Sequence, residues 1–407
     1  MSGRNAGRPR RKPSGSLVSL PKTQAVGVMR RRLWGILLIA ALAVPATGAA
    51  QGQGIRVGLA VAIKSDIALY GDPIRNGFLI AFRQFNERRL ILIDPIIEDT
   101  GGSRDGAIDA FQKLIRRDEV AVILGPVLSS QAFAADPLAV QAGVPVVAVS
   151  NPAKGIPEIG PTVFRISAPE AAQIPKEIAT AKKVLHLERV VVLYDNADDS
   201  TVSGYRAFAD ELEKNGIQVA DTITFARGGS DFSEPLARAK AAAPQAIIVS
   251  ALAREGALLL TQARGLGISV PFIGGYGLND ASVLAGAGAA AEGLIVGAAW
   301  VPSAPSVMNV KFYNAYKDTY KREPNQLAAQ AYAGAQVVAE AIRRASLAGG
   351  ESIRTQRTRI TEALKTIKNF QTPLGRISIT SARDVDQPRT YVAVVRGGRF
   401  VELNAPW

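Results

Sequence analysis

Polar side chains stand directly after several of the apolar, β-branched runs of this 407-residue sequence. The run Val120–Leu124 is followed by Gly125-Pro126 and then by two hydroxyls, Ser129 and Ser130, at the start of an expected helix over 130–141. Two hydroxyls and the first free amides of a helix can together hold a carboxylate. Serine is also a favoured helix cap whether or not anything binds there, so both interpretations stay open at this point.

Other expected strands of the first half also end in polar turns. After Val144–Val149 comes the turn Ser150-Asn151-Pro152-Ala153-Lys154. A neighbouring strand end is where a second contact to the same anion would come from. Tyr70 follows the run Ile55–Ile63, and its ring would either cover an apolar ligand or pack at the start of a helix.

The second half of the chain shows the same arrangement. Val190–Tyr194 ends in the acidic run Asp195-Asn196-Ala197-Asp198-Asp199-Ser200-Thr201, and Val270–Ile273 ends in Gly274-Gly275-Tyr276-Gly277. Acidic side chains could hold a ligand ammonium or a metal, but an Asp before a helix is also a common cap. Both halves therefore place polar groups where a cleft between two lobes would lie.

The elements that position these turns alternate between β-branched runs and amphipathic stretches, the pattern of parallel sheets covered by helices. The first set of expected strands is 55–63, 92–97, 120–124, 144–149 and 163–166, with helices near 73–88, 104–117 and 130–141. A helix over 169–186 opens a second set, with strands at 190–194, 217–222, 246–250, 270–273 and 293–298. Three helices between 306 and 369 and strands at 376–380, 390–395 and 399–403 follow. We therefore predict an α/β fold of two Rossmann-like lobes with a ligand cleft between them.

The formal charge of +13 arises mainly in residues 1–50, which hold nine Lys or Arg and no Asp or Glu, whereas residues 51–407 hold 39 basic and 35 acidic residues. Nucleic-acid binding thereby loses its main support. The cluster Arg30-Arg31-Arg32, the apolar run Leu33–Val44 and the small residues up to Ala50 predict a secretory signal over about 29–50, too short to span a membrane. We expect a periplasmic protein that begins near Gln51, and the absence of cysteine excludes disulfides from its fold.

Enzymatic interpretations lack the residues they need. The one histidine, His186, lies near a helix end, and neither a Gly-x-Ser-x-Gly motif nor a His-rich metal spacing occurs. The run Gly286–Ala291 matches the dinucleotide fingerprint in its glycine spacing but precedes a strand rather than a helix. We therefore expect a binding protein without cofactor or metal, not an enzyme.

About a dozen short motifs follow one another in a particular order between residues 53 and 407. They are Gly58-Leu59-Ala60, Leu69-Tyr70-Gly71-Asp72, Asn76-Gly77, Glu98-Asp99, Gly125-Pro126 with Ser129-Ser130, Pro145–Ser150, Phe164-Arg165, Tyr194-Asp195, Asp231-Phe232, Gly274-Gly275 and Ala291-Glu292-Gly293. No single motif is specific, but their order resembles that of the periplasmic branched-chain amino-acid-binding proteins of ABC transporters.

The resemblance implies the type I periplasmic binding protein fold with a three-segment hinge. Lobe 1 would comprise 53–167 and 301–385, and lobe 2 would comprise 168–300 and 386–407, after an extension and signal over 1–50. It also implies a monomer that closes on a small carboxylate ligand and delivers it to a membrane permease and its ATPase.

Carried over by position, the resemblance implies that Ser129 and Ser130 hold a ligand α-carboxylate, with Ser150 and Ala153 on the neighbouring loop and Tyr70 lining the cleft. The chain departs from the family at three further candidate site residues. These are Lys154 in place of a threonine, Tyr276 in place of the acid that meets a ligand ammonium, and Ser200 where relatives commonly have an aromatic residue.

These departures bear on the class of ligand. Because Tyr276 cannot neutralise an ammonium and Lys154 adds a cation, deaminated carboxylates are expected to bind at least as well as amino acids, unless Asp195, Asp198 or Asp199 reaches the cleft. The predicted function is a solute-binding protein of an ABC importer for a branched-chain or other amino acid or a related organic or aromatic acid. The alternative is an amide or amino-acid sensor of the same fold that acts on a receptor or regulator.

Overall fold

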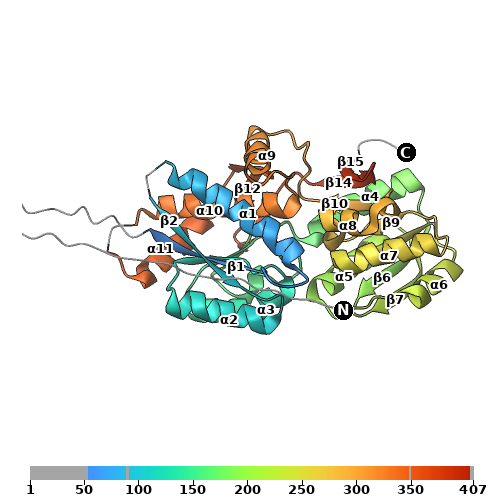
Figure 1. The fold of residues 1–407 in the computed structure, drawn as a ribbon, viewed down its shortest axis with the longest axis horizontal. Coiled ribbons are helices and arrows are strands. Elements are labelled where there is room, and N and C mark those ends of the chain that lie inside the picture. The colour runs from blue at the N-terminus through green and yellow to red at the C-terminus, as the bar shows by residue number, and fades with distance from the viewer. Residues whose placement is uncertain (1–53, 89–90, 348–349, 404–407) are drawn as a thin grey trace, which may run out of the picture. The chain divides into compact units, whose positions relative to one another are not determined.

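Two sheets, one parallel and the other mainly parallel, form the framework of the described residues, and helices cover each sheet (Figure 1). The computed structural model describes residues 54–88, 91–347 and 350–403. The predicted signal segment over 1–50 lies outside the described residues. The sheets described below both belong to one unit, Gln51–Trp407.

The first sheet has five parallel strands in the order β2-β1-β3-β4-β5. Their bounds are β1 Ile55–Val61, β2 Ile93–Asp99, β3 Val122–Leu124, β4 Val146–Ala148 and β5 Val163–Arg165. Every residue of β3, β4 and β5 is buried, as expected for strands that are covered on both faces. Figure 1 shows α1 and α10 on one side of this sheet and α2 and α3 on the other.

The helices that accompany the first sheet come from two distant parts of the chain. They are α1 Ala68–Asn86, α2 Arg104–Gln112 with a π-helical turn Lys113–Arg117, α3 Ser129–Gln141, α9 Val307–Tyr320, α10 Gln326–Ala345 and α11 Ile353–Lys365. Helix α1 begins at Ala68, before the start near Pro73 that the sequence predicts. Pro73 therefore lies inside the helix. We call the residues around this sheet the first lobe.

The second sheet has seven strands in the order β15-β14-β10-β9-β8-β6-β7. Its strands are β6 Arg189–Asp195, β7 Gln218–Phe225, β8 Ala246–Ser250, β9 Phe272–Gly274, β10 Ile295–Ala298, β14 Tyr391–Arg396 and β15 Arg399–Glu402. Strands β6 to β10 are mutually parallel where they pair, whereas β14 and β15 add an antiparallel edge. The accompanying helices are α4 Glu170–Leu185, α5 Asp199–Lys214, α6 Ser233–Ala241, α7 Ala253–Gly265 and α8 Ala281–Ala287. We call these residues the second lobe.

The chain passes between the two sheets three times. Residues 166–169 lead from β5 to α4, residues 299–306 lead from β10 to α9, and residues 387–390 lead into β14 from a small antiparallel sheet. That small sheet consists of β11 Phe370–Thr372, β12 Gly375–Ile379 and β13 Val385–Asp386. The predicted α/β fold with two parallel sheets is confirmed. We propose that the lobes divide at these passages, as 53–167 with 301–385 and 168–300 with 386–407.

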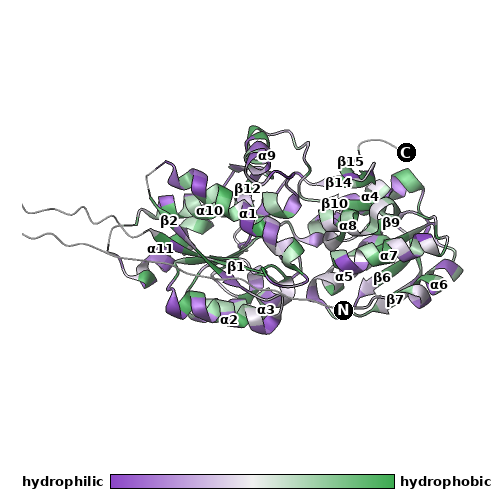
Figure 2. Ribbon diagram, viewed as in Figure 1, coloured by the Kyte–Doolittle hydropathy of each residue, from purple (hydrophilic) through white to green (hydrophobic). Residues whose placement is uncertain are grey.

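Besides short 3-10 turns, the described residues contain three elements that were not predicted from the sequence: β11, β13 and α8. The two strands are only three and two residues long, which leaves too little periodicity to detect. Helix α8 lies in a segment rich in Gly and Ala, and its start is set by Asp280, whose side chain accepts from the N–H of Ser282. Figure 2 shows that the strands are mainly hydrophobic, whereas the covering helices also carry hydrophilic residues.

The packing of α1 against α10 depends on a glycine. A Cβ atom placed on Gly77 of α1 would lie 2.4 Å from the backbone oxygen of Ala328 in α10. Real Cβ atoms do not approach a backbone oxygen so closely, so the two helices would have to move apart. Gly77 therefore sets the distance between α1 and α10 and, through it, the position of Tyr70 on α1.

We predict that Gly77→Ala destabilises the protein by about 1–3 kcal/mol, because it overpacks this contact. The control is Gly265→Ala at the end of α7, where an added Cβ would have no neighbouring atom within 4 Å. That change should be neutral or stabilise by about 0.4–1 kcal/mol. Urea unfolding of both variants measures the effect, and equal stability of the two would show that α1 and α10 are not in tight contact.

Candidate ligand-binding site

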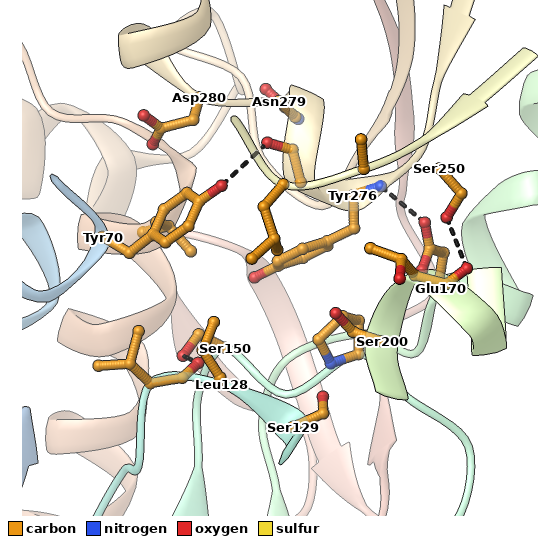
Figure 3. A pocket seen from close by; sticks show the side chains of 17 residues that line it. Tyr70, Leu128, Ser129, Ser150, Glu170, Ser200, Ser250, Tyr276, Asn279 and Asp280 are labelled. Atoms are coloured by element: carbon orange, nitrogen blue, oxygen red, sulfur yellow. Dashed lines mark hydrogen bonds between the residues drawn. The ribbon is translucent and has the colours of Figure 1, made fainter. Parts of the chain in front are cut away.

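A pocket lies between the two lobes, at the carboxyl ends of their parallel strands (Figure 3). Hydroxyl, carboxyl and apolar side chains from both lobes line it. The first lobe contributes Tyr70, Val127, Leu128, Ser129, Ser150, Pro152 and Leu327. The second lobe contributes Glu170, Ser200, Thr201, Ser250, Ala251, Leu252, Tyr276, Gly277, Asn279 and Asp280.

Ser129 is the first residue of α3, directly after the loop that leaves β3. The Gln131 side chain accepts from the N–H of Leu128 at 3.1 Å and closes the start of this helix. The Ser129 hydroxyl oxygen accepts from the N–H of Ala153 at 3.3 Å, which joins the β3 and β4 loops. The first amides of a helix have no acceptor within the helix, so this end of the pocket offers N–H and O–H donors to an anion.

Five of the eight sequence-predicted site residues line the pocket: Tyr70, Ser129, Ser150, Ser200 and Tyr276. Two of the three serine hydroxyls already donate to protein acceptors. Ser150 donates to the Val127 carbonyl at 2.7 Å, and Ser200 donates to Asp198 at 2.6 Å. Their contribution to the pocket is therefore mainly to position the backbone around them.

The other three predicted residues are not among those that line this pocket. The Ser130 hydroxyl faces Asp198 of the second lobe at 3.4 Å, and Ala153 is buried behind Ser129. Lys154 lines a separate, larger hollow between α5 and the 154–158 turn, while its backbone N–H donates to the Ser203 hydroxyl at 3.0 Å. The expected cation at the carboxylate end is thus absent from the pocket lining.

The acidic run after β6 has structural roles. Asp198 caps α5 by accepting from the N–H groups of Ser200 and Thr201, as the capping interpretation predicts. Asp195 accepts from two backbone N–H groups, and burial raises the pKa of its carboxyl. Asp199 forms an ion pair with Arg104 at 2.6 Å. None of these three carboxylates is among the residues that line the pocket.

Two tyrosines each reach across to the opposite lobe. The Tyr70 hydroxyl accepts from the N–H of Ala253 at the start of α7 at 2.5 Å. The Tyr276 hydroxyl donates to the side-chain oxygen of Gln330 on α10 at 2.6 Å. Burial raises the pKa of both phenols, so both stay protonated at neutral pH. These reciprocal bonds hold the two lobes together around the pocket.

Sequence reasoning missed Glu170, the first residue of α4. Glu170 is only 4% exposed. Its side chain lines the pocket and accepts a hydrogen bond from the N–H of Tyr276 at 2.7 Å. Burial raises its pKa to about 7, against the opposing effect of the Tyr276 bond. No Lys, Arg or His is among the described residues that line the pocket. Glu170 is therefore a buried carboxylate without a cationic partner from the protein.

The second acid in the pocket, Asp280, is already engaged. It accepts from the N–H and hydroxyl of Ser282 and from the amide of Asn325 at 2.8 Å. The expectation that a ligand ammonium would find no acid was based on Tyr276 and did not consider Glu170. Acidic residues are common in the first turn of a helix because they interact favourably with the helix dipole. The position of Glu170 in the sequence therefore does not indicate a binding role.

The features that point to catalysis or metal binding remain without support. His186 follows α4 in a left-handed conformation and is not among the residues that line the pocket, and Gly288–Ala291 forms a short 3-10 turn. Within residues 54–403, apart from the undescribed positions, no cluster of three metal-ligating side chains occurs. No described helix is long and apolar enough to cross a membrane.

The fold and the pocket between its lobes define a two-lobed α/β binding protein. The chain belongs to the Periplasmic binding protein family, which matches residues 54–399. The predicted resemblance and the prediction that the chain is a binding protein rather than an enzyme are confirmed.

Individual relatives cover most of the chain. A leucine-, isoleucine-, valine-, threonine- and alanine-binding protein of Pseudomonas aeruginosa is 27% identical over 86% of this chain and 92% of its own length. The crystal structure of a leucine-binding protein from Thermotoga maritima has a TM-score of 0.79 and 26% identity, over 86% of this chain and 97% of that one. A solute-binding protein of Rhodopseudomonas palustris BisB5, in complex with 3,4-dihydroxybenzoic acid, has a TM-score of 0.76 and 26% identity, over 86% and 96%.

We predict that Glu170→Gln changes the pH dependence of stability in the ligand-free protein. The folded protein binds the Glu170 proton more tightly than the unfolded chain does. The protonated Glu170 side chain therefore contributes its full stabilisation at pH 4, and this contribution is lost as the pH rises through about 7. Relative to wild type, Glu170→Gln should therefore gain about 1–3 kcal/mol between pH 5 and pH 8. Thermal unfolding at several pH values measures this difference, and a pH-independent difference would contradict the burial of an ionisable Glu170.

Proposed function

We propose that this protein is the periplasmic solute-binding component of an ABC importer, which captures a small ligand and delivers it to a membrane permease. The family, the two-lobed fold and the pocket that both lobes line support this proposal. Relatives described as amino-acid-binding or ABC transporter substrate-binding proteins share most of their length with this chain. The tyrosine bonds between the lobes fit a protein that encloses its ligand.

The proposed ligand is an α-amino acid with an apolar side chain, and the observation that carries this choice is Glu170. At one end of the pocket, Ser129 and the first amides of α3 suit a carboxylate. At another part of the pocket, the buried Glu170 carboxylate has no cationic side chain beside it and therefore suits a ligand ammonium, because a buried charge needs an opposite one. Apolar lining from Leu128, Leu252 and Leu327 suits an aliphatic or aromatic body.

An aromatic or other organic acid is the second candidate. A solved relative holds 3,4-dihydroxybenzoic acid. With its pKa raised to about 7, Glu170 can also be protonated and donate a hydrogen bond to an uncharged group. The amino acid is favoured because an ammonium stabilises the ionised carboxylate, whereas a keto group at the same place leaves Glu170 without a cation.

Calorimetric titration of ligand-free protein separates these candidates. We predict that leucine binds ~10–100-fold more tightly than 4-methyl-2-oxopentanoate, and phenylalanine more tightly than phenylpyruvate, from a charged hydrogen bond of about 1.5–3 kcal/mol. Glu170→Gln should remove most of that preference. The control is Glu177→Gln, a buried acid on the same helix that is not among the residues lining the pocket, and it should keep the preference.

Two results would contradict the proposal. Equal or tighter binding of the keto acids by wild type would show that the ligand carries no ammonium. A preference for amino acids that survives in Glu170→Gln would show that another group binds the ammonium.

A further inference from the structure

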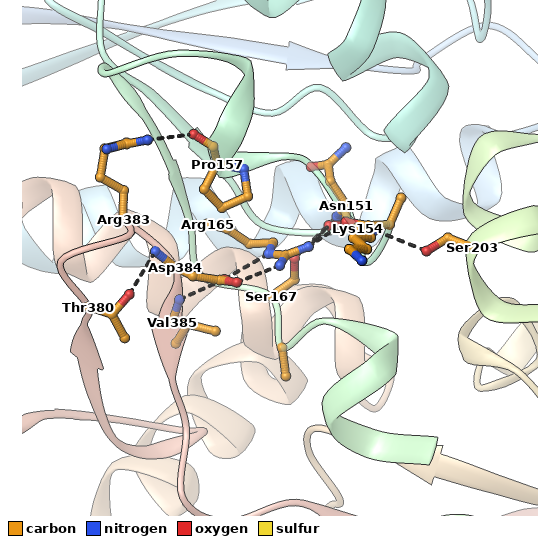
Figure 4. A network of polar contacts seen from close by, with 12 residues as sticks. Asn151, Lys154, Pro157, Arg165, Ser167, Ser203, Thr380, Arg383, Asp384 and Val385 are labelled. Carbon is orange, nitrogen blue, oxygen red and sulfur yellow. Dashed lines mark hydrogen bonds and ion pairs between the residues drawn. The ribbon is translucent and has the colours of Figure 1, made fainter. Parts of the chain in front are cut away.

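Arg165, the last residue of β5, is a buried arginine at the origin of the first passage between the lobes (Figure 4). Arg165 is only 3% exposed. Its guanidinium forms a two-pronged ion pair with Asp384, with Nε at 2.8 Å from Oδ1 and Nη2 at 2.5 Å from Oδ2. Its remaining nitrogen, Nη1, donates to the carbonyls of Ala153 at 2.6 Å and Asn151 at 3.3 Å. One side chain thus binds two separate segments.

The segment Asn151–Lys154 meets both lobes through its backbone. The N–H of Ala153 donates to the Ser129 hydroxyl in the pocket at 3.3 Å. The next N–H, of Lys154, donates to the hydroxyl of Ser203 on α5 of the second lobe at 3.0 Å. Because Arg165 holds the carbonyls of the same turn, its position fixes the direction in which these two N–H groups point.

The Asp384 side of the pair is anchored just before the third passage. Arg383 adopts a left-handed backbone conformation with φ of 64°, and its side chain donates to the Pro157 carbonyl at 2.9 Å. The backbone N–H of Arg165 donates to the Arg383 carbonyl at 3.0 Å, and Asp384 accepts from the N–H of Val385 at 2.8 Å. The ion pair therefore connects the start of one passage, the approach to another, and the turn beside Ser129.

We propose that Arg165 is a positioning residue for ligand binding: it fixes the Asn151–Lys154 turn so that Ala153 supports Ser129 and Lys154 docks on Ser203 when the lobes are closed. The proposal rests on the proposed binding function and adds a residue that does not line the pocket. Without the guanidinium, two carbonyls lose their donor, the turn shifts, and the closed form loses its contact with α5. The bound ligand is then released faster.

The test compares Arg165→Met with a matched control, Arg357→Met. Arg357 on α11 is also buried, at 9% exposure, and also donates to three backbone carbonyls of the first lobe, those of Val120, Ile115 and Ala142. Both variants lose a buried arginine and its carbonyl bonds, so a general loss of stability should appear in both. Only Arg165→Met should alter the turn beside Ser129.

Two readouts are measured. In the ligand-free protein, residue-resolved amide exchange at Ala153 should become about tenfold faster or more in Arg165→Met and stay within about twofold of wild type in Arg357→Met. In stopped-flow dissociation with L-leucine as the probe, koff should rise about tenfold or more for Arg165→Met only. Arg165→Lys, which keeps the charge but not the fork, should lie between wild type and Arg165→Met in both readouts.

Unchanged exchange at Ala153 in folded Arg165→Met, or equal effects of the two Met variants, would overturn the proposal. If wild type does not bind L-leucine, the proposed ligand class fails, while the exchange measurement still tests the role of Arg165. If Arg165→Met does not fold, Asp384→Asn takes its place and is expected to speed exchange at Ala153 in the same direction; no change there would overturn the proposal.

Discussion

The pocket exists because the carboxyl ends of two parallel sheets face one another within a single unit of the chain. In a parallel sheet every strand ends at the same edge, so the loops and helix starts that follow the strands gather there. Ser129 and Ser150 lie at such strand ends or helix starts in the first lobe, and Ser200, Ser250 and Tyr276 do so in the second. The direction of the strands thus determines which residues can meet a ligand.

Bonds between the lobes close this arrangement. The tyrosine bond to Ala253 is buried and the one to Gln330 is partly buried, whereas the ion pairs Arg104–Asp199 and Arg227–Asp66 lie at more exposed positions. Exposed ion pairs stabilise little in water, so the buried bonds and the ligand itself should decide how firmly the lobes stay together. Arg165 lies at the start of one of the three passages between the sheets, and its partner Asp384 lies just before another.

Periodicity alone predicts the strand and helix alternation, because β-branched runs covered on both faces leave a strong signal. The strand-end rule likewise brings Tyr70, Ser129, Ser150, Ser200 and Tyr276 to the pocket. It fails for Lys154, because the direction of a side chain in a tight turn depends on backbone contacts such as those of Arg165. It also misses Glu170, because an acidic residue is common in the first turn of a helix for electrostatic reasons alone. Only the structure shows that the Tyr276 turn packs against this carboxylate.

The central claim is that the ligand lies with its carboxylate at the start of α3 and its ammonium at Glu170. A crystal structure of the protein with bound L-leucine tests this claim most directly. The account predicts an ammonium nitrogen within hydrogen-bond distance, about 2.7–3.2 Å, of a Glu170 oxygen and a carboxylate beside Ser129. A ligand whose ammonium lies against other groups, with Glu170 still unpaired, would contradict it.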